Sequence, residues 1–135
     1  MATLKQIRKL KATIHEYDLE APDNFFLCTD KELAAMYNGA GPDWLGKWGR
    51  ERLTSRLDLF EAAFLVHDFE YACSDHTEEG FDDANKRMWQ NMLKIIFGVY
   101  SWRKISDWDN IAYWLVKAFA AYRACARLGW SAWLD

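Results

Sequence analysis

Apolar residues recur every three or four positions along most of the chain, which is the period of an amphipathic α-helix. The first helix is expected at residues 3–19, where the apolar stripe comprises Leu4, Ile7, Leu10, Ile14 and Tyr17. Its basic residues lie mostly on the other face and are explained by contact with water: Lys5, Arg8, Lys9 and Lys11. The turn-forming residues 21–24 end this helix. Thr29 and Glu32 have the spacing of a capping box, which predicts a short helix ending at Met36.

A loop is expected at residues 37–52, which hold four of the seven glycines and one of the two prolines. A central helix should then begin after a cap at Thr54 or Ser55 and run to Ser74, followed by a turn at residues 75–80. The third long helix is expected at residues 81–100, with a buried stripe of Phe81, Ala84, Met88, Met92, Ile95 and Ile96. A loop at residues 101–107 leads to a last helix at residues 108–128, closed by Gly129.

These elements predict an all-α fold, in which two central antiparallel helices joined by a short turn pack with N- and C-terminal helices. Residues 1–135 are expected to form a single domain. The composition is 51% hydrophobic and 16% aromatic, so a packed core is expected, with Trp89 and Trp114 inside it. The last helix has an apolar stripe of Trp108, Ile111, Leu115, Phe119 and Tyr122. A basic amphipathic helix can lie on a membrane, but here the basic residues are few, so packing onto the helix pair is favoured.

Charge and cysteine content exclude several classes of protein. The net charge of −3 argues against a general nucleic-acid binder. Cys28, Cys73 and Cys125 are an odd number without metal-site spacing, so we expect buried free thiols and no disulfide framework. The N-terminus lacks the continuous apolar core of a signal peptide, and no apolar stretch suits a transmembrane helix. We therefore expect a soluble cytoplasmic protein, or one carried in a particle assembled in the cytoplasm.

The central helix places His67 and Asp68 among apolar residues, where both side chains need partners. Tyr71 follows four residues after His67 and shares its face. On the third helix Asn85 lies on the same face as Met88, so antiparallel packing should bring Asn85 opposite His67 and Tyr71. Asp82 and Asp83 should be more exposed.

Two further features favour a divalent cation near this pair. Between Arg56 and Lys86 there is no Lys or Arg, whereas nine Asp and Glu fall there. Gly39 and Gly41 tolerate positive φ angles, so successive carbonyls can turn toward one centre. Calcium is bound by several oxygen ligands, commonly backbone carbonyls with a carboxylate. Asp68 would supply that carboxylate.

Together these residues resemble the three motifs of the phospholipase A2 superfamily, and are most similar to its disulfide-free forms, such as the domain of parvovirus capsid proteins. The matching segments are Tyr37-x-Gly39-x-Gly41, His67-Asp68-x-x-Tyr71 and Ala84-Asn85-x-x-Met88. The resemblance covers about residues 37–92, roughly two fifths of the chain. It implies calcium-assisted hydrolysis of a phospholipid ester, and a viral or phage protein would suit it.

The resemblance also implies a role for each matching residue. The carbonyls of Tyr37, Gly39 and Gly41 and the carboxylate of Asp68 would bind calcium. His67 would activate the attacking water, and Tyr71 would donate a supporting hydrogen bond. Asn85 stands where the family has an Asp that orients the His. An amide oxygen still accepts a hydrogen bond but brings no charge, and the same exchange in a serine protease costs about 10⁴ in rate. Whether hydrolysis is retained, weakened or lost is therefore open.

Two other functions remain open at this stage. A non-catalytic helical protein, for example a viral structural part or an inhibitor, could have kept this scaffold and bind a protein partner through its Trp-rich surface. A metal phosphohydrolase could instead use His15, His67, Asp68 and Asp107 or Asp109. The expected partner is a phospholipid or membrane surface if the chain is active, and in no case a nucleic acid.

Overall fold

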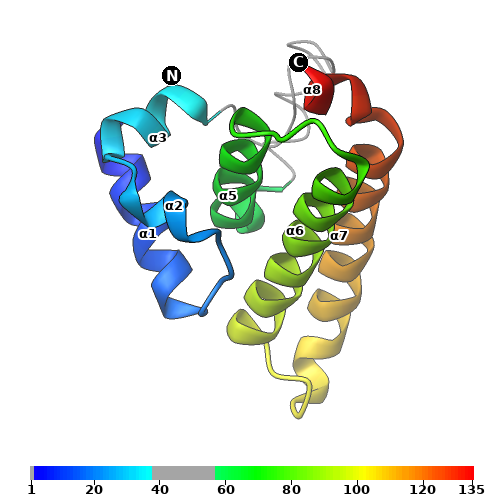
Figure 1. The fold of residues 1–135 in the computed structure, drawn as a ribbon. Coiled ribbons are helices and arrows are strands. Elements are labelled where there is room, and N and C mark those ends of the chain that lie inside the picture. The colour runs from blue at the N-terminus through cyan, green and yellow to red at the C-terminus, as the bar shows by residue number, and fades with distance from the viewer. Residues whose placement is uncertain (1, 38–56) are drawn as a thin grey trace.

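The computed structural model describes residues 2–37 and 57–135, and these are helical without any β-strand. The prediction of an all-α fold is confirmed. The helices are drawn in Figure 1. They are α1 (Leu4–Glu16), α2 (Asp23–Leu27), α3 (Asp30–Met36), α5 (Glu61–Ala72), α6 (Glu78–Val99), α7 (Trp108–Leu128) and α8 (Trp130–Leu134). Short 3₁₀ turns, η2 (Asp58–Phe60) and η3 (Ile105–Asp107), precede α5 and α7.

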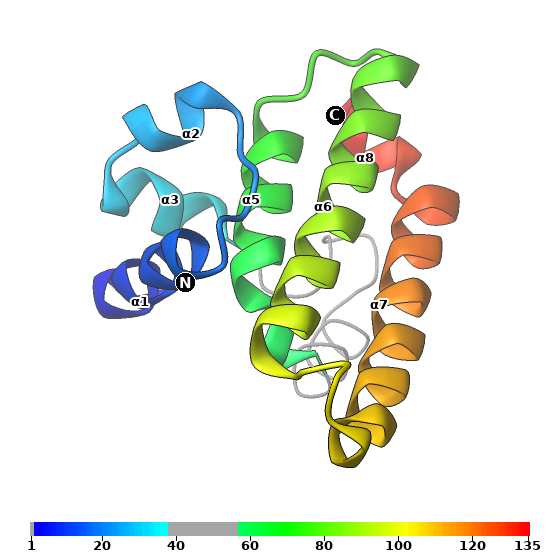
Figure 2. The same cartoon turned by 90° about the horizontal axis from the view of Figure 1, so that it is seen from below.

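The helix α5 lies between two groups of helices. Seen from below, α1, α2 and α3 lie on one side of α5, and α6 and α7 lie on the other (Figure 2). The contacts agree with this view, because α5 packs against α1 and α3 and also against α6, while α7 packs against α6. Most side chains of α5 are therefore buried, and these include the polar side chains of His67 and Glu70.

The helix α1 begins as expected but ends earlier than residue 19. Thr3 forms a complete capping box with Gln6. At the other end Asp18 adopts a positive φ of 53°, and the N–H of Leu19 donates to the carbonyl of Ile14 at 2.9 Å. That left-handed residue ends the helix at Glu16, because a helix cannot continue through it.

The segment after α1 differs from the expected plain turn. Pro22 is the N-cap of a short helix, α2, which the sequence pattern did not predict. Its extended backbone, φ −60° and ψ 150°, leads directly into the first turn of that helix. The next helix, α3, is the one predicted, since Thr29 and Glu32 form the capping box and Met36 is its last residue.

The turn between α5 and α6 is shorter than predicted. The α5 helix ends at Ala72 and α6 already begins at Glu78. The reason is a cap inside the expected turn: the hydroxyl of Thr77 accepts a hydrogen bond from the N–H of Gly80 at 3.0 Å. Asp75 in turn accepts hydrogen bonds from both the N–H and the hydroxyl of Thr77. The predicted caps of the central helix, Thr54 and Ser55, lie outside the described residues.

The helix α6 buries the predicted stripe, and α7 packs on it. All six predicted apolar residues of α6 are buried. The buried residues of α7 are Ile111, Ala118 and Ala121, so only part of its predicted stripe was right. Trp108 and Phe119 are about half exposed instead, because the small side chains of Ala118 and Ala121 form the contact face. Gly129 follows Leu128 as expected, but a further short helix, α8, was not predicted.

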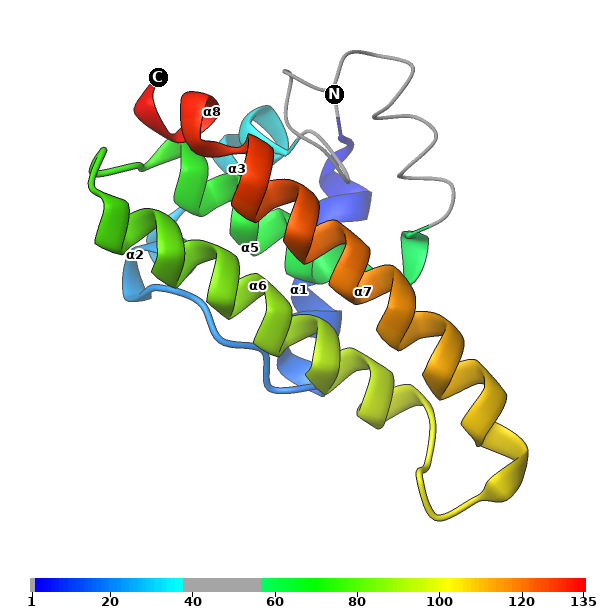
Figure 3. The ribbon, with the colours of Figure 1, turned by 90° about the vertical axis from the view of Figure 1, so that its right-hand side faces the viewer.

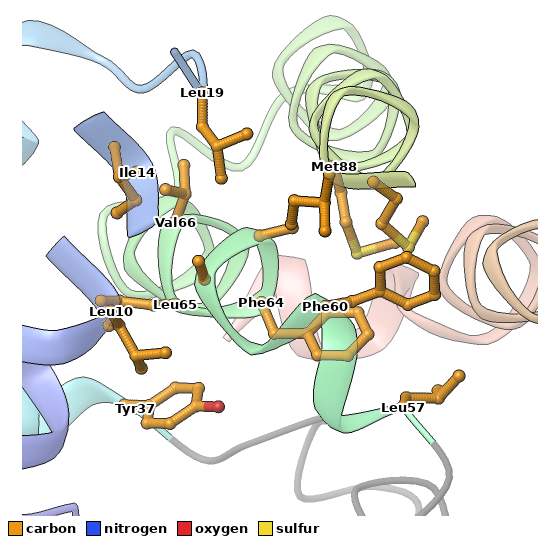
Figure 4. Packing of buried hydrophobic residues seen from close by; sticks show 14 of the residues in the cluster. Leu10, Ile14, Leu19, Tyr37, Leu57, Phe60, Phe64, Leu65, Val66 and Met88 are labelled. Carbon is orange, nitrogen blue, oxygen red and sulfur yellow. The ribbon is translucent and has the colours of Figure 1, made fainter. Parts of the chain in front are cut away.

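The core is formed where α1, α3, α5 and α6 meet. Figure 4 shows Phe60, Phe64 and Val66 of the central segment among side chains of the neighbouring helices. Trp89 and Trp114 are partly buried and pack against this core, so the expectation for them holds in part. Asn91 is fully buried and binds both polar groups of the Glu20 backbone, each at 2.8 Å. It thereby fixes the connection between α1 and α2 to α6.

The cysteines are free but less buried than predicted. Cys28 and Cys125 are partly buried, whereas Cys73 is exposed. Cys73 follows the last residue of α5 as its C-cap, at the surface turn, which explains its exposure. No helix within residues 2–37 and 57–135 has the length and apolar character needed to span a bilayer.

Candidate functional site

The candidate site lies where the second half of α5 meets the first turns of α6. The Nε2 atom of His67 lies 2.8 Å from the Oδ1 atom of Asn85. The hydroxyl of Tyr71 donates to the same oxygen at 3.0 Å. His67 is 5% exposed and Asn85 2% exposed, so the hydrogen bond between them is buried. The predicted proximity of these three side chains is therefore observed, and Asp82 and Asp83 are exposed as expected.

The hydrogen bonds determine where the proton of His67 sits. An amide oxygen only accepts, so the Nε2 atom must carry the proton and donate to Asn85. A neutral imidazole carries one N–H, so the Nδ1 atom is left with its lone pair. Burial lowers the pKa of His67 to about 4, and the hydrogen bond with Asn85 opposes that shift only in part. The imidazole is thus neutral at pH 7, as a general base must be.

The amide nitrogen of Asn85 is the weak point of this arrangement. The Oδ1 atom accepts two hydrogen bonds, but the Nδ2 atom is buried and has no partner among the residues that the structure describes. A buried donor left without a partner costs about 1–3 kcal/mol. A carboxylate at this position would remove that donor and keep both existing bonds.

The hydroxyl of Tyr71 is held in place by residues from the C-terminal part of the chain. The ring centroids of His67 and Tyr71 are 4.3 Å apart, and Trp133 packs edge-on against Tyr71 at 5.2 Å. Gly129 approaches so closely that an added Cβ atom would lie 2.6 Å from the Tyr71 hydroxyl oxygen. The end of α7 therefore closes one side of the site.

The charge of Asp68 acts on two groups at this side of the site, Cys125 and Tyr71. Burial raises the pKa of Cys125 to about 12, and the charge of Asp68 adds to that rise. Burial likewise raises the pKa of Tyr71, with smaller contributions from Cys125 and Asp68. Sequence reasoning missed Cys125 and Gly129 because α7 carries no motif there. Their position depends on how α7 packs.

Tyr37, the only described residue of the glycine motif, also lies within electrostatic reach of Asp68. Burial raises the pKa of the Tyr37 hydroxyl, and the charges of Glu61 and Asp68 raise it further. Glu61 and Asp68 are seven residues apart on α5 and thus share a face. Figure 4 shows the Tyr37 ring beside Leu10 in the core below α5. The Tyr37 hydroxyl and the Asp68 carboxylate are therefore close enough to interact electrostatically.

Of the proposed calcium ligands, Tyr37 and Asp68 belong to the described residues. The charges of Asp68 and Glu61 both act on Tyr37, and carboxylate oxygens are ligands that calcium prefers. Gly39 and Gly41 lie outside the described residues. Within the described residues no group of three His, Cys, Asp or Glu could hold a metal. A site made mainly from backbone carbonyls would not form such a group.

The residues of the alternative phosphohydrolase are not brought together. His15 is exposed on α1, with its ring centroid 6.1 Å from that of Phe26. Asp107 accepts a hydrogen bond from the N–H of Ser101 at the start of α7. All the proposed ligands belong to the described part of the chain, and no group of three His, Cys, Asp or Glu there could hold a metal ion.

A second polar pair of α5 and α6 was not predicted. Glu70 is buried, and its Oε1 atom accepts a hydrogen bond from Arg87. Both residues line a pocket of about 250 Å³ together with Phe69 and Trp133. His67, Asn85 and Tyr71 do not line this pocket, so we assign it no part in the chemistry of His67.

The chain was also compared with known proteins. Comparison with protein families, with curated proteins and with solved structures finds no match.

Proposed function

We propose that this protein is a phospholipase A2-like hydrolase, in which His67 activates water to attack a phospholipid ester with the help of calcium. The observation that carries this proposal is the hydrogen bond between the His67 Nε2 atom and the Asn85 Oδ1 atom, joined by the Tyr71 hydroxyl. It leaves the Nδ1 atom as the basic nitrogen of a neutral imidazole. We place this function in a soluble protein of the cytoplasm or of a virion.

The chain's own residues would supply the proton transfers. The Nδ1 atom of His67 would take a proton from the water as its oxygen attacks the sn-2 carbonyl carbon, and would then return it to the leaving alkoxide. Asn85 fixes the ring through the Nε2 atom, and Tyr71 holds Asn85. Because Asn85 carries no charge, it would stabilise the imidazolium less than an Asp would, and we expect a slow enzyme.

Asp68 and the carbonyl oxygens of Tyr37, Gly39 and Gly41 would bind the calcium ion. When bound, calcium would attract the phosphate of the lipid and stabilise negative charge on the carbonyl oxygen. The carboxylates around Asp68 support this assignment, because Glu61 lies on the same face of α5 and Asp58 lies close enough to Glu61 to raise its pKa. A cluster of negative charges attracts a divalent cation.

The proposal is tested by the release of fatty acid from phospholipid vesicles that carry a labelled sn-2 chain. We expect calcium-dependent release by the natural chain and none by the variant His67→Ala. His15→Ala is the matched control, because His15 is exposed on α1. Equal release by the natural chain and His67→Ala, with both folded, would show that His67 is not the base.

The metal is tested separately by calorimetry with calcium. We expect one binding site in the natural chain that is lost in Asp68→Asn. Asp83→Asn removes an exposed carboxylate from α6 and should leave the binding unchanged. Two results would contradict the calcium assignment. One is no heat of binding by the natural chain at millimolar calcium, and the other is the same heat in Asp68→Asn as in Asp83→Asn.

A non-catalytic binding protein is the second candidate, and a specific observation favours it. Asn85 is neutral and its amide nitrogen has no partner among the described residues, which is a poor arrangement for catalysis. Such a protein would have kept the scaffold and would bind a partner through its aromatic surface. It would release no fatty acid, and Asn85→Asp would not create activity.

A further inference from the structure

The connection between α6 and α7 exposes apolar side chains that folding does not require. We call residues 99–108 the α6–α7 tip. Trp102 is 63% exposed, Ile105 76% and Trp108 55%. Figures 1 and 3 show that this end of the two helices extends beyond the rest of the molecule. Exposed apolar groups gathered in one place usually mark an interaction surface.

The backbone of the tip is fixed, so this exposure is a property of a defined structure. The N–H of Ser101 donates to the Asp107 carboxylate at 2.8 Å, and the N–H of Asp107 donates to the carbonyl of Lys104 at 3.0 Å. The indole N–H of Trp108 donates to the carbonyl of Trp102 at 2.8 Å. The tip therefore holds its apolar side chains outward instead of folding them inward.

Basic side chains accompany the aromatic ones. The guanidinium carbon of Arg103 lies 5.3 Å from the centre of the Trp102 ring, and Lys104 is exposed beside it. Along α7 the same pairing recurs, with Lys117 over Tyr113 at 5.5 Å and Arg123 over Phe119 at 5.7 Å. The tip itself holds Arg103 and Lys104 against Asp107, and residues 101–128 as a whole hold five Lys and Arg against two Asp in a chain of net charge −3.

We propose that the α6–α7 tip docks on the surface of a phospholipid bilayer that contains anionic lipid. Trp102 and Trp108 would sit at the depth of the headgroups and Ile105 would reach the acyl boundary, while Arg103 and Lys104 would meet the lipid phosphates. A protruding tip suits a bilayer, which yields around an inserted side chain, whereas a protein partner would need a matching cavity. The tip follows α6 about 21 Å beyond Asn85, so this proposal does not require hydrolysis at His67.

The test is cosedimentation with vesicles of phosphatidylcholine and phosphatidylglycerol, in the presence of a calcium chelator so that no hydrolysis occurs. We expect the full chain to bind these vesicles. The double variant Trp102→Ser with Ile105→Ser should weaken binding at least tenfold. Lys104→Glu should weaken it about tenfold, because a basic residue near an anionic surface strengthens binding and this substitution reverses its charge. Vesicles of phosphatidylcholine alone should bind more weakly.

Matched controls come from α2 and α3. Leu27→Ser removes an apolar side chain that is 84% exposed, and Lys31→Glu reverses an exposed charge, so neither should change binding. Absence of binding, or an equal loss in the controls, would overturn the proposal. A dimer in sedimentation equilibrium that is lost in the tip variants, without any vesicle binding, would assign the tip to self-association and overturn it as well. These outcomes are independent of fatty-acid release.

Discussion

The imidazole of His67 donates its Nε2 proton to the amide oxygen of Asn85, 2.8 Å away, across the contact between α5 and α6. This bond fixes the tautomer of a buried histidine, and the partner that accepts it, the amide of Asn85, is uncharged. It therefore orients a base but does little to stabilise that base once protonated. Burial lowers the pKa of His67 to about 4, and the hydrogen bond with Asn85 offsets only part of that shift.

Replacing Asn85 by Asp should raise the pKa of His67 well above 4. A carboxylate keeps the hydrogen bonds of the Oδ1 atom and stabilises the imidazolium ion by its charge. It also removes the Nδ2 donor, which has no partner among the described residues. The measurement is an NMR titration of the His67 ring in both chains. Asn110→Asp makes the same chemical change at an exposed position of α7 and should leave the titration unchanged. An unaltered His67 pKa in folded Asn85→Asp would rule out the observed contact.

The stability of the protein should fall as the pH is lowered from about 6.5 toward 4. In this range the unfolded chain binds a proton at His67 with an ordinary pKa near 6.5, whereas the folded chain, with a pKa of about 4, does not. Protonation therefore favours the unfolded state, and the loss over the whole range is about 3 kcal/mol. Below about pH 4 both states are protonated and this contribution stops changing.

The pH effect is measured as the free energy of unfolding by urea at several pH values. His67→Gln should lack the part of the slope between pH 6.5 and 4 that His67 causes. His15→Gln should retain it, because His15 is exposed. The same slope in His67→Gln as in the natural chain would mean that other groups cause the pH dependence.

Gly129→Ala should disturb the site from a distance in sequence. The new Cβ atom would lie 2.6 Å from both the Tyr71 hydroxyl oxygen and the carbonyl oxygen of Cys125. Contacts that short force neighbouring atoms to move, at a cost of about 1–3 kcal/mol. We expect a lower free energy of unfolding, and a smaller loss when Gly129→Ala is made in a Tyr71→Phe chain. Ser131→Ala, an exposed change nearby, should have no effect, and strict additivity of Gly129→Ala and Tyr71→Phe would argue against their contact.

Asn91→Ala should destabilise the whole fold. Its fully buried amide group makes two 2.8 Å hydrogen bonds to the backbone of Glu20. Loss of both leaves two backbone groups without these partners, and we expect a cost of about 2–3 kcal/mol in thermal or urea unfolding. Gln90→Ala changes the exposed neighbour and should cost far less. Equal stability of the two variants would contradict the structural role of Asn91.

The sequence pattern predicted the helices well where local signals decide their limits. The α3 helix has its capping box at Thr29 and Glu32, and the limits of α7 were correct at both ends. The errors occurred where hydrogen bonds formed by particular side chains override the hydrophobic period. Thr77 starts α6 three residues early, and the positive φ of Asp18 ends α1 before its apolar stripe does.

The site could be predicted in part, because helical spacing fixes which side chains share a face. That reasoning brought His67, Tyr71 and Asn85 together. It could not find Cys125 or Gly129, since only the packing of α7 brings them to Tyr71. Gly39 and Gly41 lie outside the described residues, so the calcium loop stays a prediction.

The most direct measurement is the release of a labelled sn-2 fatty acid by Asn85→Asp in the presence of calcium. This variant places a negative charge on the partner of His67. Hydrolysis should then be detectable even if the natural chain is slow. We expect release at least tenfold faster than by the natural chain, and none when His67→Ala is added. A folded Asn85→Asp chain that releases no fatty acid at millimolar calcium would contradict the proposed hydrolase.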